Sequence, residues 1–121
     1  MIVAFSVQPT GEPSDPSLAR TLEEGADGAS VHDAVAAAVR VVRDSGLPAR
    51  TSAMFTEIEG EWDEVMDVVR RAAEEAGRYG SRLSLVLKAD IRPGREGELD
   101  GKVQRMEAAV ARLDGPRSGG D

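Results

Sequence analysis

The sequence has no cysteine, a single histidine and only 3% aromatic residues. The lack of cysteine excludes disulfide bonds, thiolate catalysis and cysteine-based zinc sites. His32 alone is too little for a histidine-rich metal site or a Ser-His-Asp set, and neither a GxxxxGK[ST] nor a GxGxxG motif is present. We therefore expect no catalytic activity and no metal or other cofactor. Because aromatic residues are scarce, aliphatic side chains and methionine must build the core.

The chain also has little positive charge. Its 15 Lys and Arg residues are outnumbered by 22 Asp and Glu residues, which gives a net charge of −7. An acidic surface repels phosphates, so we expect neither a nucleic-acid partner nor an anionic membrane partner. No apolar run approaches the roughly 20 residues of a membrane span, and the N-terminal MIVAFSVQP lacks the basic start of a signal peptide. We therefore expect a cytoplasmic protein.

The 121 residues are enough for one domain, and strand and helix patterns alternate along them. The first half is predicted to hold a strand over 2–8 ended by Pro9, a loop over 10–29 with room for a helical turn at 17–24, and a helix from an N-cap at Ser30 to Gly46. A hairpin or bulged strand over 47–60 follows, with its turn at 52–55. The second half is predicted to hold a helix over 60–80, a strand over 81–91, a turn at Pro93-Gly94 and a helix over 99–113. We expect a single domain over 1–114 and a disordered tail over 115–121.

Each predicted helix carries one apolar stripe at helical spacing. The stripes comprise Val31, Ala34, Val35, Ala38 and Val42 in the first helix; Trp62, Val65, Met66, Val69, Ala72, Ala73 and Ala76 in the second; and Leu99, Val103, Met106, Val110 and Leu113 in the last. Trp62 is the only tryptophan, and we expect its large side chain to anchor the core.

The order β-α-β-β-α-β plus a terminal helix predicts an α+β, ferredoxin-like fold, with a four-stranded antiparallel sheet and helices on one face. Strand alternation places Val3, Phe5, Leu83, Leu85 and Leu87 under the helices.

The opposite, open face of this sheet keeps apolar side chains, so we expect a second subunit to cover it in a homodimer or homotetramer. The predicted interface residues are Ile2, Ala4, Val86, Lys88 and Asp90. Lys88 and Asp90 lie on the same side of their strand, where an intersubunit salt bridge is favoured over ligand binding.

Several stretches of the sequence together resemble one protein family. They are MIVAFSVQPTG, SVHDAVAAAVRVVRDSGL, TSAMFTEIEGEWDEVMDVV, LKADIR and LDGKVQRME, and TxIEGEWDEVM over Thr56–Met66 is the most specific. In these stretches the chain resembles the YkoF-like, ferredoxin-fold thiamine-binding proteins. It departs from similar members at Ala53-Met54-Phe55, where they usually have Pro-Met-Gly, and in its longer loop over 10–29.

The resemblance implies a non-catalytic protein that binds thiamine or its hydroxymethylpyrimidine moiety at or near a subunit interface, for salvage, transport or buffering. An aminopyrimidine ring needs a few polar partners in its plane and apolar or sulfur contacts on its faces, whereas a thiazolium cation favours a carboxylate. The candidate ligand-binding residues are Ser6, Gln8, Thr51, Ser52, Met54 and Thr56, with Glu57 and Glu59 as counter-charges.

Each candidate also has a plainer role. Strand hydroxyls are usually solvated, Met54 can serve as packing, and Glu59 can favour the following helix through its dipole. Two other functions are therefore kept open. One is an oligomeric interaction or regulatory protein without a small-molecule ligand, and the other is an enzyme that uses carboxylates. Thermal stabilisation by thiamine compounds distinguishes thiamine binding from an interaction or regulatory protein without a ligand.

Overall fold

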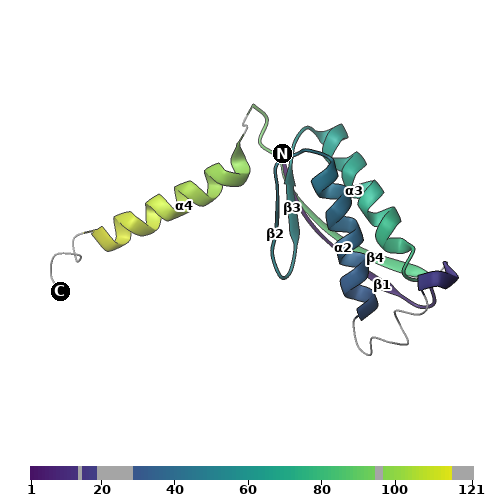
Figure 1. Cartoon of the computed structure of the whole chain (residues 1–121). Helices are drawn as coiled ribbons and strands as arrows, with labels where there is room; N and C mark the ends of the chain where they lie inside the picture. The colour runs from purple at the N-terminus through teal and green to yellow at the C-terminus, as the bar shows by residue number, and fades with distance from the viewer. Residues whose placement is uncertain (14, 19–28, 95–96, 116–121) are drawn as a thin grey trace.

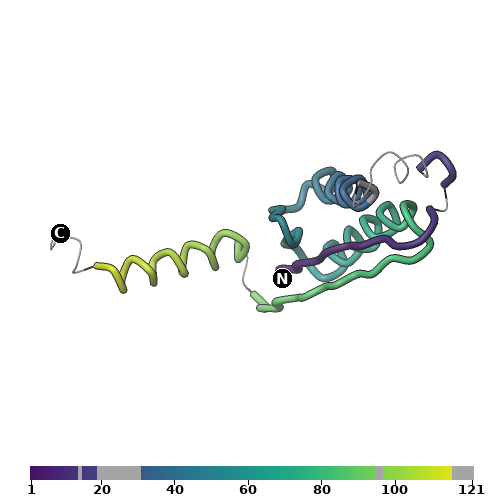
Figure 2. Tube along the Cα trace, turned by 90° about the horizontal axis from the view of Figure 1, so that it is seen from below, coloured from purple at the N-terminus to yellow at the C-terminus, as the bar shows by residue number. Residues whose placement is uncertain are grey.

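Four strands form one antiparallel sheet in the order β2-β3-β1-β4, and two helices cover one of its faces (Figure 1, Figure 2). The computed structural model describes residues 1–13, 15–18, 29–94 and 97–115. The elements are β1 (Ile2–Thr10), the short 3-10 helix η1 (Pro16–Leu18), α2 (Ala29–Asp44), β2 (Ala49–Thr51), β3 (Thr56–Glu59), α3 (Trp62–Gly77), β4 (Arg82–Asp90) and α4 (Glu98–Asp114). The predicted ferredoxin-like fold is confirmed.

The core lies between the sheet and the two helices that cover it. Alternate residues of β1 point into it, so Val3, Phe5 and Val7 are buried, and Ile58 of β3 joins them. The helices contribute mostly small side chains, namely Ala34, Ala38 and Val42 from α2 and Val65, Val68, Val69, Ala72 and Ala76 from α3. These alanines let both helix backbones approach the sheet closely, and each fully buried Val or Phe contributes about 1.5–3 kcal/mol to folding.

The central strand β1 has ladders of unequal length on its two sides. It pairs with β4 from Ile2 to Thr10, but it pairs with β3 only from Ile2 to Phe5. The shorter ladder reflects the short hairpin, in which β2 and β3 pair only from Ala49 to Thr51 against Ile58 to Thr56. Beyond Phe5, the β1 edge on the hairpin side has no strand beside it in the described part of the chain.

Two local predictions at the ends of elements are wrong. Pro9 does not end β1, because the strand continues to Thr10 with Pro9 opposite Leu83. A proline is tolerated where a strand has only one neighbour, since every second N–H points away from that neighbour. The second helix ends at Gly77 rather than at Gly80. Arg78 closes it, because the Arg78 amide donates hydrogen bonds to carbonyl groups of the last turn.

The prediction that Trp62 and Leu85 lie in the core is also wrong, because both lie at the rim of the helix layer. Trp62 is 54% exposed, since it is the first residue of α3 and borders Ile91 and Pro93 beyond the end of the sheet. Leu85 is 43% exposed, since β4 is an edge strand and α3 presents the small Ala73 beside it.

Some predictions fall where the structure gives no description. Residues 14, 19–28 and 116–121 lie outside the described residues, as do the side chains of residues 29 and 30. The N-cap at Ser30, most of the turn predicted over 17–24 and most of the predicted tail are among them. Within the described part, no helix is both long and apolar enough to cross a membrane.

The last helix, α4, leaves the domain instead of covering the sheet (Figure 1, Figure 2). Its first turn is bound to β3, because the Glu59 carboxylate accepts hydrogen bonds from the backbone N–H groups of Glu98 at 2.6 Å and Leu99 at 3.3 Å. Glu59 is buried and Leu99 packs beside it. Glu59 therefore accepts hydrogen bonds from the first turn of α4 and caps that helix from outside it, so its carboxylate is engaged within the chain.

Replacing Glu59 with alanine removes the acceptor for both amide groups and should destabilise the protein by about 1–2 kcal/mol, the range of a lost helix cap. Urea unfolding and far-UV circular dichroism measure the free energy and the helix content. Glu57→Ala is the matched control, because Glu57 is exposed on the same strand. Equal stabilities of the two variants would contradict the capping role.

Candidate functional site

A cleft of about 260 Å³ opens between α2, the hairpin turn and the second half of β1. Figure 1 shows the hairpin standing alongside α2, with its turn level with the lower half of that helix. Phe5, Ser6, Val7 and Gln8 of β1 line the cleft together with Val31, Val35, Ala38 and Val39 of α2 and Thr51 to Thr56 of the hairpin. The cleft therefore occupies the place where the β3 ladder stops.

The exposed edge of β1 supplies main-chain hydrogen-bonding groups to this cleft. Ser6, Val7 and Gln8 pair with β4 on one side, and no described residue pairs with them as a strand on the hairpin side. Along a strand, alternate residues point both N–H and C=O to the same side, so this stretch presents donors and acceptors toward the hairpin. Such an edge can hydrogen-bond a flat molecule in the plane of the sheet.

The hairpin turn is shaped by the Ser52 hydroxyl. Its oxygen accepts hydrogen bonds from the amides of Met54 at 3.3 Å and Phe55 at 3.2 Å, and it lies 3.2 Å from the Phe55 carbonyl oxygen. The Ser52 amide also donates to that carbonyl at 2.8 Å. The predicted turn over 52–55 is thus confirmed, and it holds Met54 at the mouth of the cleft with 74% of its surface exposed.

Among the described residues, none that lines the cleft carries a charge. Of the candidate ligand-binding residues, Glu57 and Glu59 lie elsewhere, and the others all line the cleft. Those in the cleft are Ser6, Gln8, Thr51, Ser52, Met54 and Thr56. The polar partners on the helix side are the hydroxyls of the hairpin and the backbone of β1, since the Ser6 and Gln8 side chains point to the open face of the sheet. Such partners suit an uncharged heterocycle better than an ion.

The α2 side of the cleft was missed in the sequence. The sequence pattern places Val31 and Val35 in the core stripe and Val39 in no stripe, yet all three are partly accessible and form the apolar wall of the cleft. The feature of the sequence that could have predicted this wall is the width of the apolar surface on α2, because Val39 extends that surface beyond one narrow stripe.

The predicted interface residues gather around a second hollow, of about 260 Å³, on the open face of the sheet. Ile2, Ala4, Lys88 and Asp90 line it with the first turns of α4, while Val86 lies farther along β4 and is 52% exposed. Asp90 is already paired within the chain, because the Lys102 ammonium bonds it and holds the pKa of its carboxyl below the ordinary value. Arg92 lies 3.7 Å from the same carboxylate.

Over the described residues, no group of three or more histidine, aspartate and glutamate side chains is arranged to hold a metal ion. Buried polar side-chain atoms in these ranges all have hydrogen-bond partners. Titratable groups with a displaced pKa lie outside the cleft lining; one is Asp15, whose pKa is lowered by hydrogen bonds from Ser17 and Arg78.

Comparison with known proteins finds related sequences and folds. A family model described as thiamine-binding protein matches residues 21–107. A UPF0045 protein of Mycobacterium bovis is 43% identical over 113 residues, which cover 93% of this chain and 96% of that protein.

Two solved structures share the fold. A domain of unknown function, DUF77, from Bacillus cereus has a TM-score of 0.66 and 30% identity over 86% of both chains. A protein of Thermotoga maritima, described provisionally as a thiamine biosynthesis/salvage protein, has a TM-score of 0.53 and 21% identity. It is matched over 88% of this chain and 99% of its own, and at that identity the likeness concerns the fold alone.

Ser52→Ala should loosen the hairpin turn, because the Met54 and Phe55 amides lose their acceptor. We expect their hydrogen exchange to become about fivefold faster, which corresponds to the loss of roughly 1 kcal/mol for one hydrogen bond. Hydrogen exchange followed by NMR measures both amides individually. Ser84→Ala, at an exposed position on β4, should leave their exchange unchanged. Unaltered rates in Ser52→Ala would show that the hydroxyl does not hold the turn.

Proposed function

Because the chain belongs to the thiamine-binding protein family, we propose that it binds thiamine through the hydroxymethylpyrimidine moiety in the cleft beside β1. The observation that carries this proposal is the neutral cleft in which a free strand edge meets an apolar helix wall. Binding is non-catalytic and serves salvage, transport or buffering in the cytoplasm.

The cleft offers the two kinds of contact that an aminopyrimidine requires. In the plane of the ring, the β1 edge at Ser6–Gln8 and the nearby hydroxyls supply donors and acceptors. On the faces of the ring, Val35 and Val39 of α2 supply apolar contact and Met54 supplies a polarisable thioether. The ring nitrogens and the exocyclic amine would thus form hydrogen bonds with backbone groups and hydroxyls, which do not titrate near neutral pH.

The absence of charge in the lining suggests which part of the ligand enters. A thiazolium cation buried without a counter-charge would lose its hydration without compensation. The pyrimidine therefore enters the cleft, and the thiazolium ring stays at the mouth, where the net charge of −7 favours a cation and disfavours phosphates. Unphosphorylated ligands should consequently bind more tightly than their phosphates.

The open face of the sheet is the proposed site of self-association in a homodimer or homotetramer. Ser6 and Gln8 alternate with buried Phe5 and Val7, so their side chains share the open face with Ile2 and Ala4. A second copy that covers this face would lie at the rim of the cleft. The ligand site would then be near a subunit interface, although the chain's own residues form its walls.

A second candidate function is an oligomeric interaction or regulatory protein without a ligand. It is favoured by the apolar surface at exposed positions of β4 and α4, which includes Val86 at 52% and Met106 at 51%. In that case the cleft would be a gap between the hairpin and α2 with no specific occupant.

A ligand series separates the two functions. Hydroxymethylpyrimidine and thiamine should each raise the melting temperature, since a ligand at 100 times its dissociation constant stabilises the folded state by about 2.7 kcal/mol. Thiamine monophosphate and diphosphate should stabilise less at equal concentration. If none of the four compounds shifts the melting curve, the interaction function is preferred.

Filling the cleft should abolish binding without unfolding the protein. Val35→Phe places a larger side chain on the α2 wall at a partly accessible position, so we expect at least a tenfold loss of affinity for hydroxymethylpyrimidine in calorimetric titration. Ala36→Phe is the matched control, because Ala36 is exposed on the same helix and outside the cleft lining. Normal affinity in Val35→Phe would place the ligand elsewhere.

A further inference from the structure

The innermost part of the cleft beside β1 is nearly all apolar. Phe5, Val7, Ala38 and Thr56 line it and are buried, whereas the other lining residues are partly or fully accessible. Of these four described residues, only Thr56 has a polar side chain, and just 6% of its surface is exposed. Hydrogen bonding by side chains at the inner end of the cleft therefore depends on one hydroxyl.

The register of the sheet directs the Thr56 side chain toward the helices. Thr56 is the first residue of β3 and pairs with Phe5, which is the last pair of the ladder between β3 and β1. Residues directly opposite each other in an antiparallel ladder place their side chains on the same face, and Phe5 is buried under the helices. Ile58, two residues along β3, is buried on that face as well. Thr56 thus lies where the ladder stops and the cleft begins.

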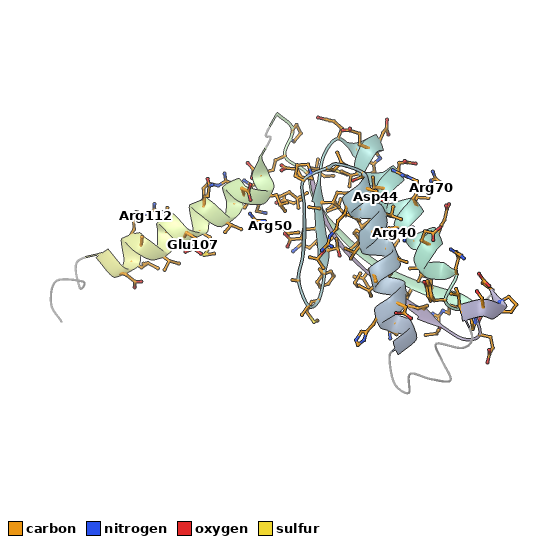
Figure 3. All side chains as sticks on the ribbon, viewed as in Figure 1. Arg40, Asp44, Arg50, Arg70, Glu107 and Arg112 are labelled. Carbon is orange, nitrogen blue, oxygen red and sulfur yellow. The ribbon has the colours of Figure 1, made fainter. Side chains whose placement is uncertain are left out.

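Among the described residues, the Thr56 hydroxyl has no hydrogen-bond partner. Over the same ranges, every fully enclosed side-chain oxygen or nitrogen does have one, so the Thr56 oxygen keeps contact with the space of the cleft. Figure 3 labels two charged residues of α2, Arg40 and Asp44, and neither of them lines this space. A hydroxyl placed this deeply without a protein partner bonds to water or to a molecule that enters the cleft.

We propose that the Thr56 hydroxyl selects the ring that the cleft accepts, by donating a hydrogen bond to a ring nitrogen. This inference rests on the proposed binding of the pyrimidine moiety in the cleft. In thiamine the thiazolium ring is attached to one side of the pyrimidine, and the ring nitrogens flank the carbon atom on the opposite side. Because the pyrimidine enters the cleft while the cation stays at the mouth, the edge that carries the ring nitrogens reaches Thr56.

The hydroxyl makes the cleft selective for nitrogen heterocycles over carbocyclic rings of the same shape. Phe5, Val7 and Ala38 accept either kind of ring, because apolar contact is not directional. A ring without nitrogen displaces water from Thr56 and offers it no acceptor, so a polar group is left buried and unpaired. The ligand class is therefore a planar ring with a hydrogen-bond acceptor at its leading edge.

The stability of a variant without the hydroxyl separates a binding role from a structural role. Valine has nearly the shape of threonine, and Thr56→Val breaks no hydrogen bond of the Thr56 hydroxyl with the described residues. Removal of a nearly buried hydroxyl that lacks a protein partner is neutral or stabilising for the folded state. The melting temperature should therefore stay the same or rise, whereas a hydroxyl needed for the fold would make it fall.

Calorimetric titration and thermal unfolding of the full chain test the proposal. Thr56→Val should bind hydroxymethylpyrimidine about tenfold more weakly, whereas Thr56→Ser, which keeps the hydroxyl, should stay within about threefold of the unmodified protein. Benzyl alcohol, a ring of similar size without nitrogen, should bind the unmodified protein about tenfold more weakly than hydroxymethylpyrimidine does. Thr10→Val is the matched control with unchanged affinity, because Thr10 is exposed on β1 and lies outside the cleft lining.

Weaker binding by Thr56→Val, together with a melting temperature that does not fall, supports the selection by Thr56. Equal affinity of Thr56→Val and the unmodified protein for hydroxymethylpyrimidine overturns it and leaves the proposed function standing. An equal loss in Thr56→Ser, equal affinity for benzyl alcohol, or a clearly lower melting temperature of Thr56→Val overturns it in the same way. If the unmodified protein binds no hydroxymethylpyrimidine at all, the proposed function fails and the selection fails with it.

Discussion

The unequal pairing of β1 is the constraint on which the site depends. A nine-residue strand is matched along its full length by β4 on one side, whereas β3 matches only its first residues up to Phe5. The short hairpin cannot extend farther, because Ser52 turns the chain immediately after β2. Main-chain groups that a longer sheet would satisfy are therefore left open between the hairpin and α2, beside a wall of valine side chains.

One face of the sheet and most of α4 remain uncovered within the described part of the chain. The core is built from small aliphatic side chains, so two helices suffice to cover one face of a four-stranded sheet. The other face meets only the first two turns of α4, of which the first is held by a buried carboxylate. The rest of α4 extends past the sheet with its apolar stripe uncovered. Over the described residues, folding thus leaves apolar side chains of β4 and α4 exposed, among them Val86 and Met106.

Most of the fold could be predicted from local patterns, because alternation and helical stripes depend on burial within the chain. The hairpin turn at 52–55, α2 with Gly46 after its end, and β4 all follow from such patterns. The predicted core position of Trp62 is wrong, since a helical stripe does not reveal that its first residue lies beyond the sheet. Six cleft residues could be predicted because the hairpin and β1 are both visible in the sequence. The role of Glu59 could not, since it depends on a contact with Glu98, 39 residues away.

The most direct test of the account is an NMR titration of the uniformly labelled protein with hydroxymethylpyrimidine. The account predicts that the largest backbone amide shifts fall at Ser6–Gln8, at Ser52–Phe55 and along the Val35–Val39 side of α2. Shifts that instead concentrate at Ile2, Ala4, Val86 and Lys88 would place the ligand on the open sheet face and contradict the assignment of the cleft beside β1.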